Sequence, residues 1–345
     1  MKKKSLNVKK RILNNLTQYS LIKHKYKIFE SNMDTYLNKG NIAAAVSGGP
    51  DSLSLAYFLK CYSVIRKRRA FFYHIDHGLR KESGLEAKII CKKLIKYDIN
   101  CKILSWKGIK PQSNLQAIAR SKRYSLLEQK CIKDKVNNLL IAHHIDDLKE
   151  NFFIRMTRGA GLEGLVSFNS IKTRFSKNLN IIRPLINIPK KDLVYTSNKV
   201  FQFYLNDPSN YEDKFKRARL RRLINELQAE GLDLNKILLT INNLSQSNIA
   251  INYFVELNIK NNVTMLNRGN RYILSHDFFN NPQEIIFRSF NQILRKVGGK
   301  FYSPRGISIS RMMKNLSSQN FKKTSLGGCL IEKINKSVII YKERS

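Results

Sequence analysis

The chain has 345 residues, of which 42% are hydrophobic, so it is long enough for two or three domains with a substantial core. Its 63 Lys and Arg residues against 25 Asp and Glu residues give a net charge of +38, which favours a polyanionic partner such as nucleic acid. It contains no apolar stretch of about 18 residues or more, so we expect no membrane span.

The N-terminal region is rich in Lys and Asn, and it is predicted to be a basic extension over residues 1–37. Residues 1–27 lack the apolar segment of a secretory signal, and we expect them to form a frayed basic arm, with RNA contact as the alternative. The five cysteines contain no C-x-x-C pair. They indicate reduced thiols and a cytoplasmic location, with neither a zinc ribbon nor an iron–sulfur site.

Strand-like and helical segments alternate up to about residue 205. Strands are predicted over residues 42–46, 70–75, 101–105 and 138–142, with a weaker one over 180–185. Helices are predicted over residues 53–66, 84–97, 115–130 and 146–156. This order favours a parallel α/β sheet covered on both faces, in which ligands bind beyond the carboxyl ends of the strands.

The most informative segment is Ser-Gly-Gly-Pro-Asp-Ser at residues 47–52, between the first predicted strand and the first predicted helix. Glycines let backbone N–H groups approach an anion closely, and the helix N-terminus adds donors and partial positive charge. The hydroxyls of Ser47 and Ser52 can donate to phosphate, and Asp51 can bind a magnesium ion that bridges phosphates. No lysine follows the glycines, so this is not a Walker A loop. A simple Gly-Pro turn is the alternative, but it leaves both serines and the aspartate unexplained.

Two further polar motifs follow predicted strands, at residues 74–80 and 142–147. Because the carboxyl ends of parallel strands meet at one edge of a sheet, one site can collect all three motifs. Four of the six histidines lie in these two segments, which favours a functional role. A zinc site formed by His143, His144 and the aspartates is an alternative, although adjacent residues on a helix point to different faces.

In combination, these motifs resemble the tRNA(Ile)-lysidine synthetases, a family of PP-loop ATP pyrophosphatases that split ATP between its α and β phosphates. The resemblance covers about residues 40–222 and includes segments 114–124, 158–165, 183–185 and 207–210; a fainter match lies at 324–329. Three residues depart from the family pattern. Gln116, Lys149 and Ala218 stand where Glu, Gln and Asn are usual.

The resemblance implies a two-step reaction that uses ATP and Mg²⁺. The family adenylates the C2 oxygen of the wobble cytidine of tRNA(Ile) with a CAU anticodon, which releases pyrophosphate. The ε-amine of free L-lysine then displaces AMP, forms lysidine and changes codon reading from AUG to AUA. The implied partners are therefore this tRNA and free lysine. The oligomeric state is left open, with a homodimer as one option.

The motifs also supply the candidate site residues. The predicted catalytic residues are Asp51, Asp147, Asp146 and His143: the first two as magnesium ligands, the last two as acceptors of the lysine proton. The predicted ATP-binding residues are Ser47, Gly48, Gly49, Pro50, Asp51, Ser52, His74, Asp76 and His77. The predicted substrate and tRNA contacts are Arg80, Arg120, Arg123, Arg158, Lys216, Arg217 and Arg221, with surface ion pairs as the alternative.

The remainder of the chain is predicted to be helical over residues 215–230, 234–259 and 282–297, and to end in a hairpin over 328–334 and 337–342. The expected fold is α/β: a Rossmann-like PP-loop (adenine nucleotide alpha hydrolase-like) catalytic domain over residues 38–215, a mainly helical linker or tRNA-binding region over 216–285, and a small α+β domain over 286–345. Phe301 and Tyr302 are candidates for base stacking, with core packing as the alternative.

Three other functions fit parts of the pattern. Another PP-loop tRNA enzyme, such as a cytidine thiolase, would require cysteines for sulfur or an iron–sulfur cluster, and the missing C-x-x-C pair argues against it. A small-molecule ligase, such as an NAD or GMP synthetase, would not need so basic a surface. A non-catalytic RNA-binding protein would not need the intact residues Asp51, Ser52, Asp146 and Asp147.

Overall fold

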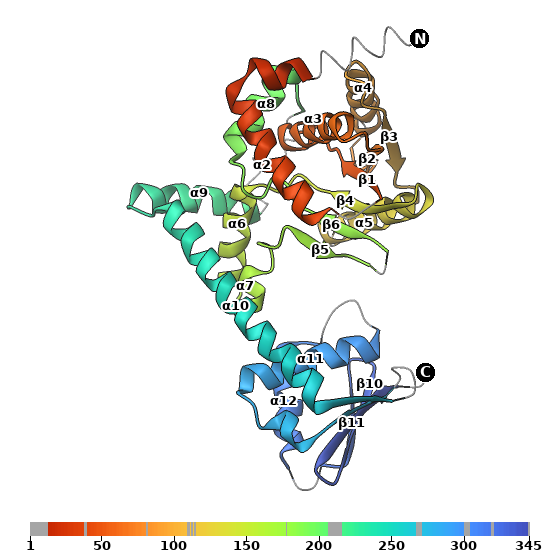
Figure 1. The fold of residues 1–345 in the computed structure, drawn as a ribbon, viewed down its shortest axis with the longest axis vertical. Coiled ribbons are helices and arrows are strands. Elements are labelled where there is room, and N and C mark those ends of the chain that lie inside the picture. Colours follow the sequence, from red (N-terminus) through yellow and green to blue (C-terminus); the bar gives the residue numbers. More distant parts are fainter. Residues whose placement is uncertain are drawn as a thin grey trace. The chain divides into compact units, whose positions relative to one another are not determined.

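The computed structural model describes residues 13–37, 40–80, 82–108, 111, 113, 115–176, 178–205, 216–266, 271–299, 304–318 and 321–343, and for residues 116, 117 and 216–218 the backbone alone. The chain divides into two compact units, residues 1–241 and 242–345, which are described separately below. Figure 1 shows the helices and strands of each unit.

The first unit is built on a six-stranded sheet with the strand order β3-β2-β1-β4-β6-β5. Its strands are β1 (Asn41–Ala45), β2 (Ala70–Asp76), β3 (Cys101–Ser105), β4 (Val136–Leu140), β5 (Lys172–Arg174) and β6 (Asn180–Ile182). All pairings are parallel except that of β5, an edge strand the sequence did not predict. The predicted parallel sheet is therefore confirmed.

Helices cover both faces of this sheet. The predicted helices are present as α3 (Pro50–Ile65), α4 (Ser83–Ile95), α5 (Leu115–Lys133) and α6 (Ile145–Met156). The side chains of β1 alternate between two cores, as a pleated strand requires. Ile42 and Ala44 pack with α3 and α4, whereas Ala43 packs with Leu127 and Cys131 of α5. The helices α7 (Leu162–Val166) and α8 (Lys190–Phe201) were not predicted.

The helix α2 (Ser20–Tyr36) corrects the expectation of a frayed N-terminal arm. Its side chains Ile22, Tyr26, Phe29 and Met33 recur at helical spacing and are almost completely buried in the core beside α3. The ring of Phe29 lies 5.6 Å from that of Phe58, measured between centroids. Helix α2 is thus part of the first unit's core; Lys23 and Lys27 occupy its outer face, and Lys25 pairs with Asp192 of α8 at 3.0 Å.

The first unit ends with α9 (Lys216–Ala229) and the start of α10 (Leu234–Asn262). Leu220 and Ile224 of α9 pack against Phe153 and Ile154 of α6 in a small apolar cluster. This packing fastens α9 to the helix that follows strand β4.

The second unit contains the rest of α10, the helices α11 (Gln283–Gly298) and α12 (Gly306–Leu316), and a short 3₁₀ helix, His276–Phe279. Its antiparallel sheet has the order β7-β8-β11-β10-β9. The strands are β7 (Val263–Leu266), β8 (Arg271–Leu274), β9 (Lys323–Leu326), β10 (Cys329–Ile334) and β11 (Ser337–Lys342). The predicted hairpin is confirmed as β10 and β11. The predicted domain boundary after residue 285 falls within α11.

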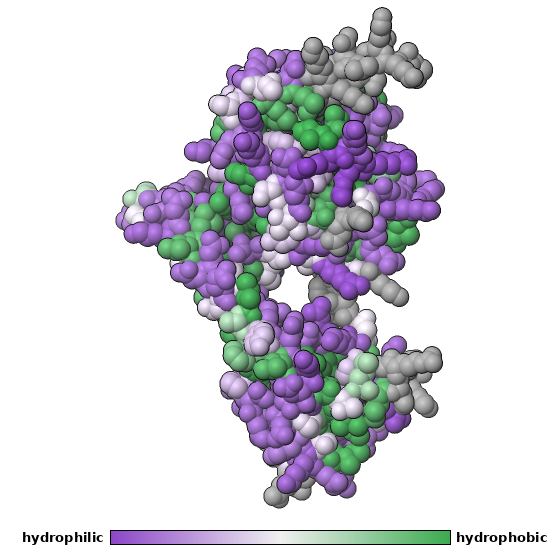
Figure 2. All heavy atoms as spheres, viewed as in Figure 1, coloured by the Kyte–Doolittle hydropathy of each residue, from purple (hydrophilic) through white to green (hydrophobic). Residues whose placement is uncertain are grey.

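Hydrophilic residues cover most of the face of the molecule shown in Figure 2. Across the described part of the chain, no helix combines the length and apolarity needed to cross a bilayer.

Truncation of Phe29 tests whether α2 is part of the core. We expect Phe29→Ala to lower the free energy of unfolding by about 3–5 kcal/mol, because it removes a fully buried aromatic ring. Lys27→Ala, at an exposed position on the same helix, is the matched control and should change stability by less than about 0.5 kcal/mol. Urea unfolding measures both; equal effects would contradict the assignment of α2 to the core.

Candidate active site

The loop between β1 and α3 is closed by the hydroxyl of Ser52. Its Oγ accepts hydrogen bonds from the backbone N–H groups of Ser47 and Gly48, both at 3.0 Å, and donates to the carbonyl of Gly49 at 3.0 Å. The Ser47 hydroxyl lies 3.1 Å from the same oxygen. Ser52 is almost completely buried, so it shapes the loop from within.

Glycine is required at position 48 for two separate reasons. Its φ of +94° lies in a region that L-residues rarely adopt. A Cβ atom there would lie 2.4 Å from Cδ1 of Ile90 on α4. The carbonyl of Gly48 also accepts a hydrogen bond from the N–H of Leu205 at 2.9 Å. The loop is therefore held between α4 and the segment that follows α8.

The N-terminus of α3 is suited to an anion. Gly49 is the N-cap in extended conformation, Pro50 occupies the first helical position, and no side chain caps the first turn. The N–H groups of this turn consequently point out of the helix with the positive end of the helix dipole. This arrangement supports the predicted phosphate cradle.

The carboxylates of Asp51 and Asp147 meet at the imidazole of His144. The Nε2 atom of His144 lies 3.5 Å from Oδ2 of Asp51 and 3.4 Å from Oδ2 of Asp147. Asp147 Oδ2 also accepts the backbone N–H of His144 at 3.1 Å, as part of a capping box that begins α6. The predicted magnesium ligands are thus brought together from the ends of two neighbouring strands.

His144 is nearly buried, and its pKa reflects competing effects. Burial lowers the pKa of the imidazole, but its hydrogen bond to Asp51 and the negative charges of Asp147, Asp51 and Asp146 outweigh burial, so the pKa is raised. The Nδ1 atom of His144 accepts the backbone N–H of Asp146 at 3.2 Å, so the ring carries its proton on Nε2, which faces both carboxylates. The sequence analysis considered His144 only for the alternative zinc site, and its adjacency to the Asp-Asp pair was the available signal.

The residues present fit a divalent cation. The Oδ1 atom of Asp51 is buried and has no hydrogen-bond partner, which is costly for a carboxylate unless a cation or ligand meets it. Over the described residues, no group of three or more His, Cys, Asp or Glu side chains has the arrangement of a metal site. Mg²⁺ commonly needs only one or two carboxylates because substrate phosphates and water complete its coordination.

Asp146 has partners of its own. Its Oδ2 accepts the backbone N–H of Lys190 at 2.9 Å, and its Oδ1 lies 3.8 Å from the Nζ atom of Lys149. Asp146 therefore links the start of α6 to the start of α8. Lys149, one of the departures from the family pattern, contacts this carboxylate directly.

The motif at the end of β2 packs beneath the loop. His74 is nearly buried, with Nδ1 2.8 Å from the carbonyl of Val46, and burial lowers its pKa. Asp76 Oδ1 accepts the N–H of Gly78 at 2.9 Å and the hydroxyl of Ser83 at 2.8 Å. His77 packs edge-on against Trp106. In these contacts His74 and Asp76 support the turn, and their contact with ATP remains a prediction.

His143 contacts Arg183 and Phe168. Arg183 Nε donates to His143 Nδ1 at 3.3 Å, and the His143 ring lies 4.7 Å from that of Phe168 between centroids. The sequence analysis treated Arg183 only as part of a motif. Its position at the end of β6, next to β4, is the feature that could have identified it as a site residue.

Several predicted tRNA contacts have partners within the protein. Arg80 pairs with Glu86 at 2.9 Å, and Arg221 Nη2 lies 3.4 Å from Oε2 of Glu150, a buried residue of α6. Arg120 and Arg123 lie over the ring of Tyr124, whereas Arg158 is exposed. The side chains of Lys216 and Arg217, and the predicted elements at residues 207–210 and 301–302, lie outside the described residues.

Comparison with known proteins identifies relatives. Residues 19–227, more than half of the chain, match the model of the PP-loop domain family. The tRNA(Ile)-lysidine synthase of Rickettsia typhi is 34% identical over 337 residues, which cover 92% of this chain and 74% of that protein. The tRNA(Ile)-lysidine synthase of Wolbachia sp. subsp. Brugia malayi is 29% identical over 327 residues, with the same two coverages.

Among solved structures, the U34-tRNA thiolase NcsA of Methanococcus maripaludis, described with its [4Fe-4S] cluster, is similar in fold. It shares 22% sequence identity and a TM-score of 0.52 over 61% of this chain and 74% of that chain. At this level of identity the similarity supports the PP-loop fold alone.

Substitution of Gly48 tests the constraint on the loop. We expect Gly48→Ala to destabilise the protein by at least about 1–3 kcal/mol and to weaken ATP binding, because a strained φ is combined with a clash against Ile90. Gly108→Ala is the matched control, since Gly108 has φ +104° but open space around its Cα. Thermal unfolding and ATP titration calorimetry measure both variants. Equal losses would mean that backbone strain, and not the contact with Ile90, is the constraint.

Proposed function

Because the chain belongs to the PP-loop family of tRNA(Ile)-lysidine synthases, ATP-using ligases that modify tRNA, we propose that it joins free L-lysine to C2 of the wobble cytidine of tRNA(Ile) with a CAU anticodon. The product is lysidine, and the modified anticodon reads AUA in place of AUG. A cytoplasmic location, where tRNA and ATP are available, is part of this proposal. The observation that carries it is the meeting of Asp51 and Asp147 at the phosphate-binding loop in a chain with these relatives.

In the first step, the C2 oxygen of cytidine attacks the α-phosphate of ATP, the bond to the β-phosphate breaks, and pyrophosphate leaves. The N–H groups in the first turn of α3 support this step by binding phosphate oxygens, whereas those of Ser47 and Gly48 are held by Ser52. Ser52 keeps the loop in shape, and Ser47 can donate its hydroxyl to phosphate once it turns away from Ser52.

Asp51 and Asp147 would hold the magnesium ion. The buried, unpartnered Oδ1 of Asp51 supplies a ligand that is already desolvated, and Asp147 supplies one from the start of α6. A magnesium ion bound there supplies positive charge against the departing pyrophosphate. His144 would keep the two carboxylates near each other before ATP arrives, because it contacts both.

In the second step, the ε-amine of lysine attacks C2, the C2–O bond breaks and AMP leaves. The amine is protonated at neutral pH, so it must lose a proton before it attacks. The sequence predicts Asp146 and His143 as acceptors, and both follow β4. Asp146 is held in place by the backbone N–H of Lys190 and by the side chain of Lys149.

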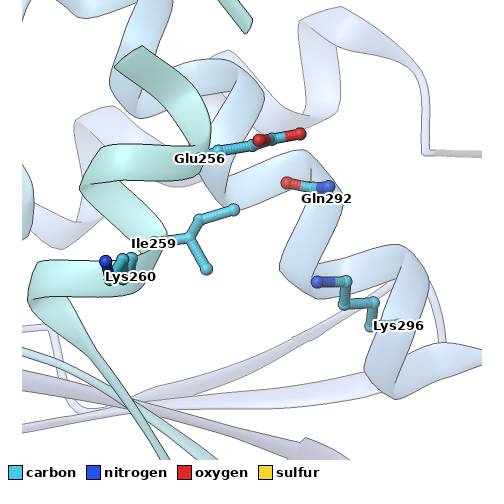
Figure 3. Close-up of a pocket in the computed structure, with 5 residues that line it drawn as sticks. All are labelled: Glu256, Ile259, Lys260, Gln292 and Lys296. Atoms are coloured by element: carbon cyan, nitrogen blue, oxygen red, sulfur yellow. The ribbon is translucent and has the colours of Figure 1, made fainter. Parts of the chain in front are cut away.

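The second unit offers a surface for the tRNA backbone. A groove of about 270 Å³ lies between α10 and α11 and is lined by Glu256, Ile259, Lys260, Gln292 and Lys296 (Figure 3). Both lysines are exposed, and such side chains bind phosphate by releasing condensed counterions. We propose that these lysines contact the phosphate backbone of the tRNA.

A tRNA thiolase is the rival activity, since the fold relative among solved structures is one. Two of the buried cysteines, Cys61 and Cys131, are unsuited to it. Cys61, Cys91, Cys131 and Cys329 are buried, and burial raises the pKa of Cys61 and Cys131 to about 12. Thiols with so high a pKa are poor nucleophiles and poor sulfur carriers.

The decisive experiment is lysine incorporation. We expect purified protein with ATP, Mg²⁺ and CAU-tRNA(Ile) to incorporate radiolabelled lysine and release AMP. Asp51→Asn should lower this rate at least about 100-fold, because it removes the charge that serves the metal, while tRNA binding by filter assay stays within about twofold.

Two results would contradict parts of this assignment. AMP release without lysine incorporation would support the adenylation step but exclude lysine as the nucleophile. A parallel loss of activity and tRNA binding in Asp51→Asn would mean that Asp51 maintains the fold and not the metal.

The groove lysines are tested by salt dependence. We expect Lys260→Gln/Lys296→Gln to weaken tRNA binding and to reduce the slope of log K against log salt by about 1.4–1.8, the value for two lost phosphate contacts. Lys314→Gln/Lys336→Gln is the control, because it makes the same charge change at exposed positions outside the groove. Identical slopes in the two variants would exclude the groove as a specific contact.

A further inference from the structure

We propose that Arg183 holds His143 as the neutral tautomer with its proton on Nε2, so that His143 serves the reaction as a hydrogen-bond donor and not as the proton acceptor. The inference deepens the proposed lysine ligation and depends on it for the identity of the reaction. The tautomer itself depends only on the contact between these two side chains.

Arg183 is fixed independently of His143. Its Nη1 donates to the carbonyl of Ser170 at 2.9 Å and to the hydroxyl of Thr173 at 2.8 Å, both beside the edge strand β5. Its guanidinium carbon lies 5.2 Å from the centroid of the Phe168 ring. Three contacts therefore orient the guanidinium, and its Nε–H bond points at His143.

The contact determines where the histidine proton lies. An arginine Nε is always a donor, because guanidinium has no acceptor and does not deprotonate in proteins. The Nδ1 atom of His143, 3.3 Å from Arg183 Nε, must therefore be the acceptor and carry no proton. A neutral imidazole has one N–H, so the proton lies on Nε2.

The same contact opposes a role as base. To accept a proton, His143 would have to become an imidazolium with N–H groups on both nitrogens, one of them facing the Nε–H of Arg183. It would then place a second positive charge beside the guanidinium. The ring is also held by Phe168, at a centroid distance of 4.7 Å, which limits rotation away from Arg183.

A neutral N–H donor suits a different task at this position. His143 follows β4 and immediately precedes His144, which contacts the magnesium carboxylates. Its Nε2–H can stabilise negative charge on an oxygen of the adenylated cytidine. As the Nζ–C2 bond forms and the C2–O bond breaks, AMP takes the electron pair. The amine proton passes to an acceptor other than His143, for which the carboxylate of Asp146 is the candidate.

Glutamine is the informative replacement for His143. Its side-chain oxygen can accept from Arg183 while its NH₂ group donates in place of Nε2–H, but it cannot act as a base. In single-turnover lysine transfer by the full-length protein, we expect His143→Ala to lose on the order of 10- to 100-fold, the effect of a lost hydrogen bond to a charged group. His143→Gln should be at least about fivefold faster than His143→Ala. Equal rates for the two variants would overturn the donor role.

A spectroscopic measurement tests the tautomer without the reaction. In protein labelled with ¹⁵N-histidine, long-range ¹H–¹⁵N correlations should show Nδ1 of His143 as unprotonated and Nε2 as protonated, with the resonance assigned by its loss in His143→Gln. Arg183→Met should disturb this pattern, whereas Arg183→Lys, which retains a donor, should preserve it in part. A protonated Nδ1 in the unsubstituted protein would overturn the proposal. If no variant or parent incorporates lysine but the tautomer is as expected, the proposed function fails and the Arg183–His143 contact stands.

Discussion

The imidazole of His144 is the interaction on which the site depends, because it joins two strand ends that the chain builds separately. Asp51 lies in the first turn of α3, after β1, and Asp147 lies in the first turn of α6, after β4. Two carboxylates this near each other repel, and the repulsion is strong where water is scarce. The Nε2–H group of His144 lies between them, because Nδ1 accepts the backbone N–H of Asp146, and its contacts with both carboxylates offset part of their repulsion. The ring thus holds together the two carboxylates that we propose as magnesium ligands.

The phosphate loop is shaped before any ligand binds. Ser52 ties two loop N–H groups to itself, Ile90 fills the space that a side chain at position 48 would need, and Leu205 binds the loop carbonyl. Each contact comes from a different part of the first unit. A loop held in this way would lose little entropy on binding an anion, which is the advantage of a preorganised site.

Much of this architecture could be predicted from the sequence, and the failures have physical causes. The strands β1 to β4 are apolar runs between polar turns, so their pattern is visible locally. The helix α2 was missed because it lies in a Lys- and Asn-rich N-terminal region, and its buried face is apparent only from the spacing of Ile22, Tyr26, Phe29 and Met33. Short strands such as β5 and β7 depend on their neighbours for pairing and have little pattern of their own.

Within the site, the motifs identified the correct loops but could not assign every side chain. Adjacent histidines at positions 143 and 144 leave the same strand end in different directions. One meets the carboxylates and the other meets Arg183. The partner of His143 is Arg183, which follows β6 and lies 40 residues later in the chain, and no local pattern carries that information. A role that depends on which nitrogen of a histidine carries the proton can therefore be assigned only from the tertiary structure.

The excess of positive charge must be divided between side chains paired within the protein and exposed side chains before it is assigned to RNA binding. Arg80 and Arg221 pair with carboxylates of the protein, and Arg183 is used inside the site. The charge of Arg221 offsets the buried Glu150, so its removal would leave a carboxylate unpaired and destabilise the contact between α6 and α9. A loss of tRNA binding in an Arg221 variant would therefore not distinguish a lost RNA contact from a folding defect. Exposed lysines on the second unit are the better test of backbone binding, because their removal leaves no buried charge behind.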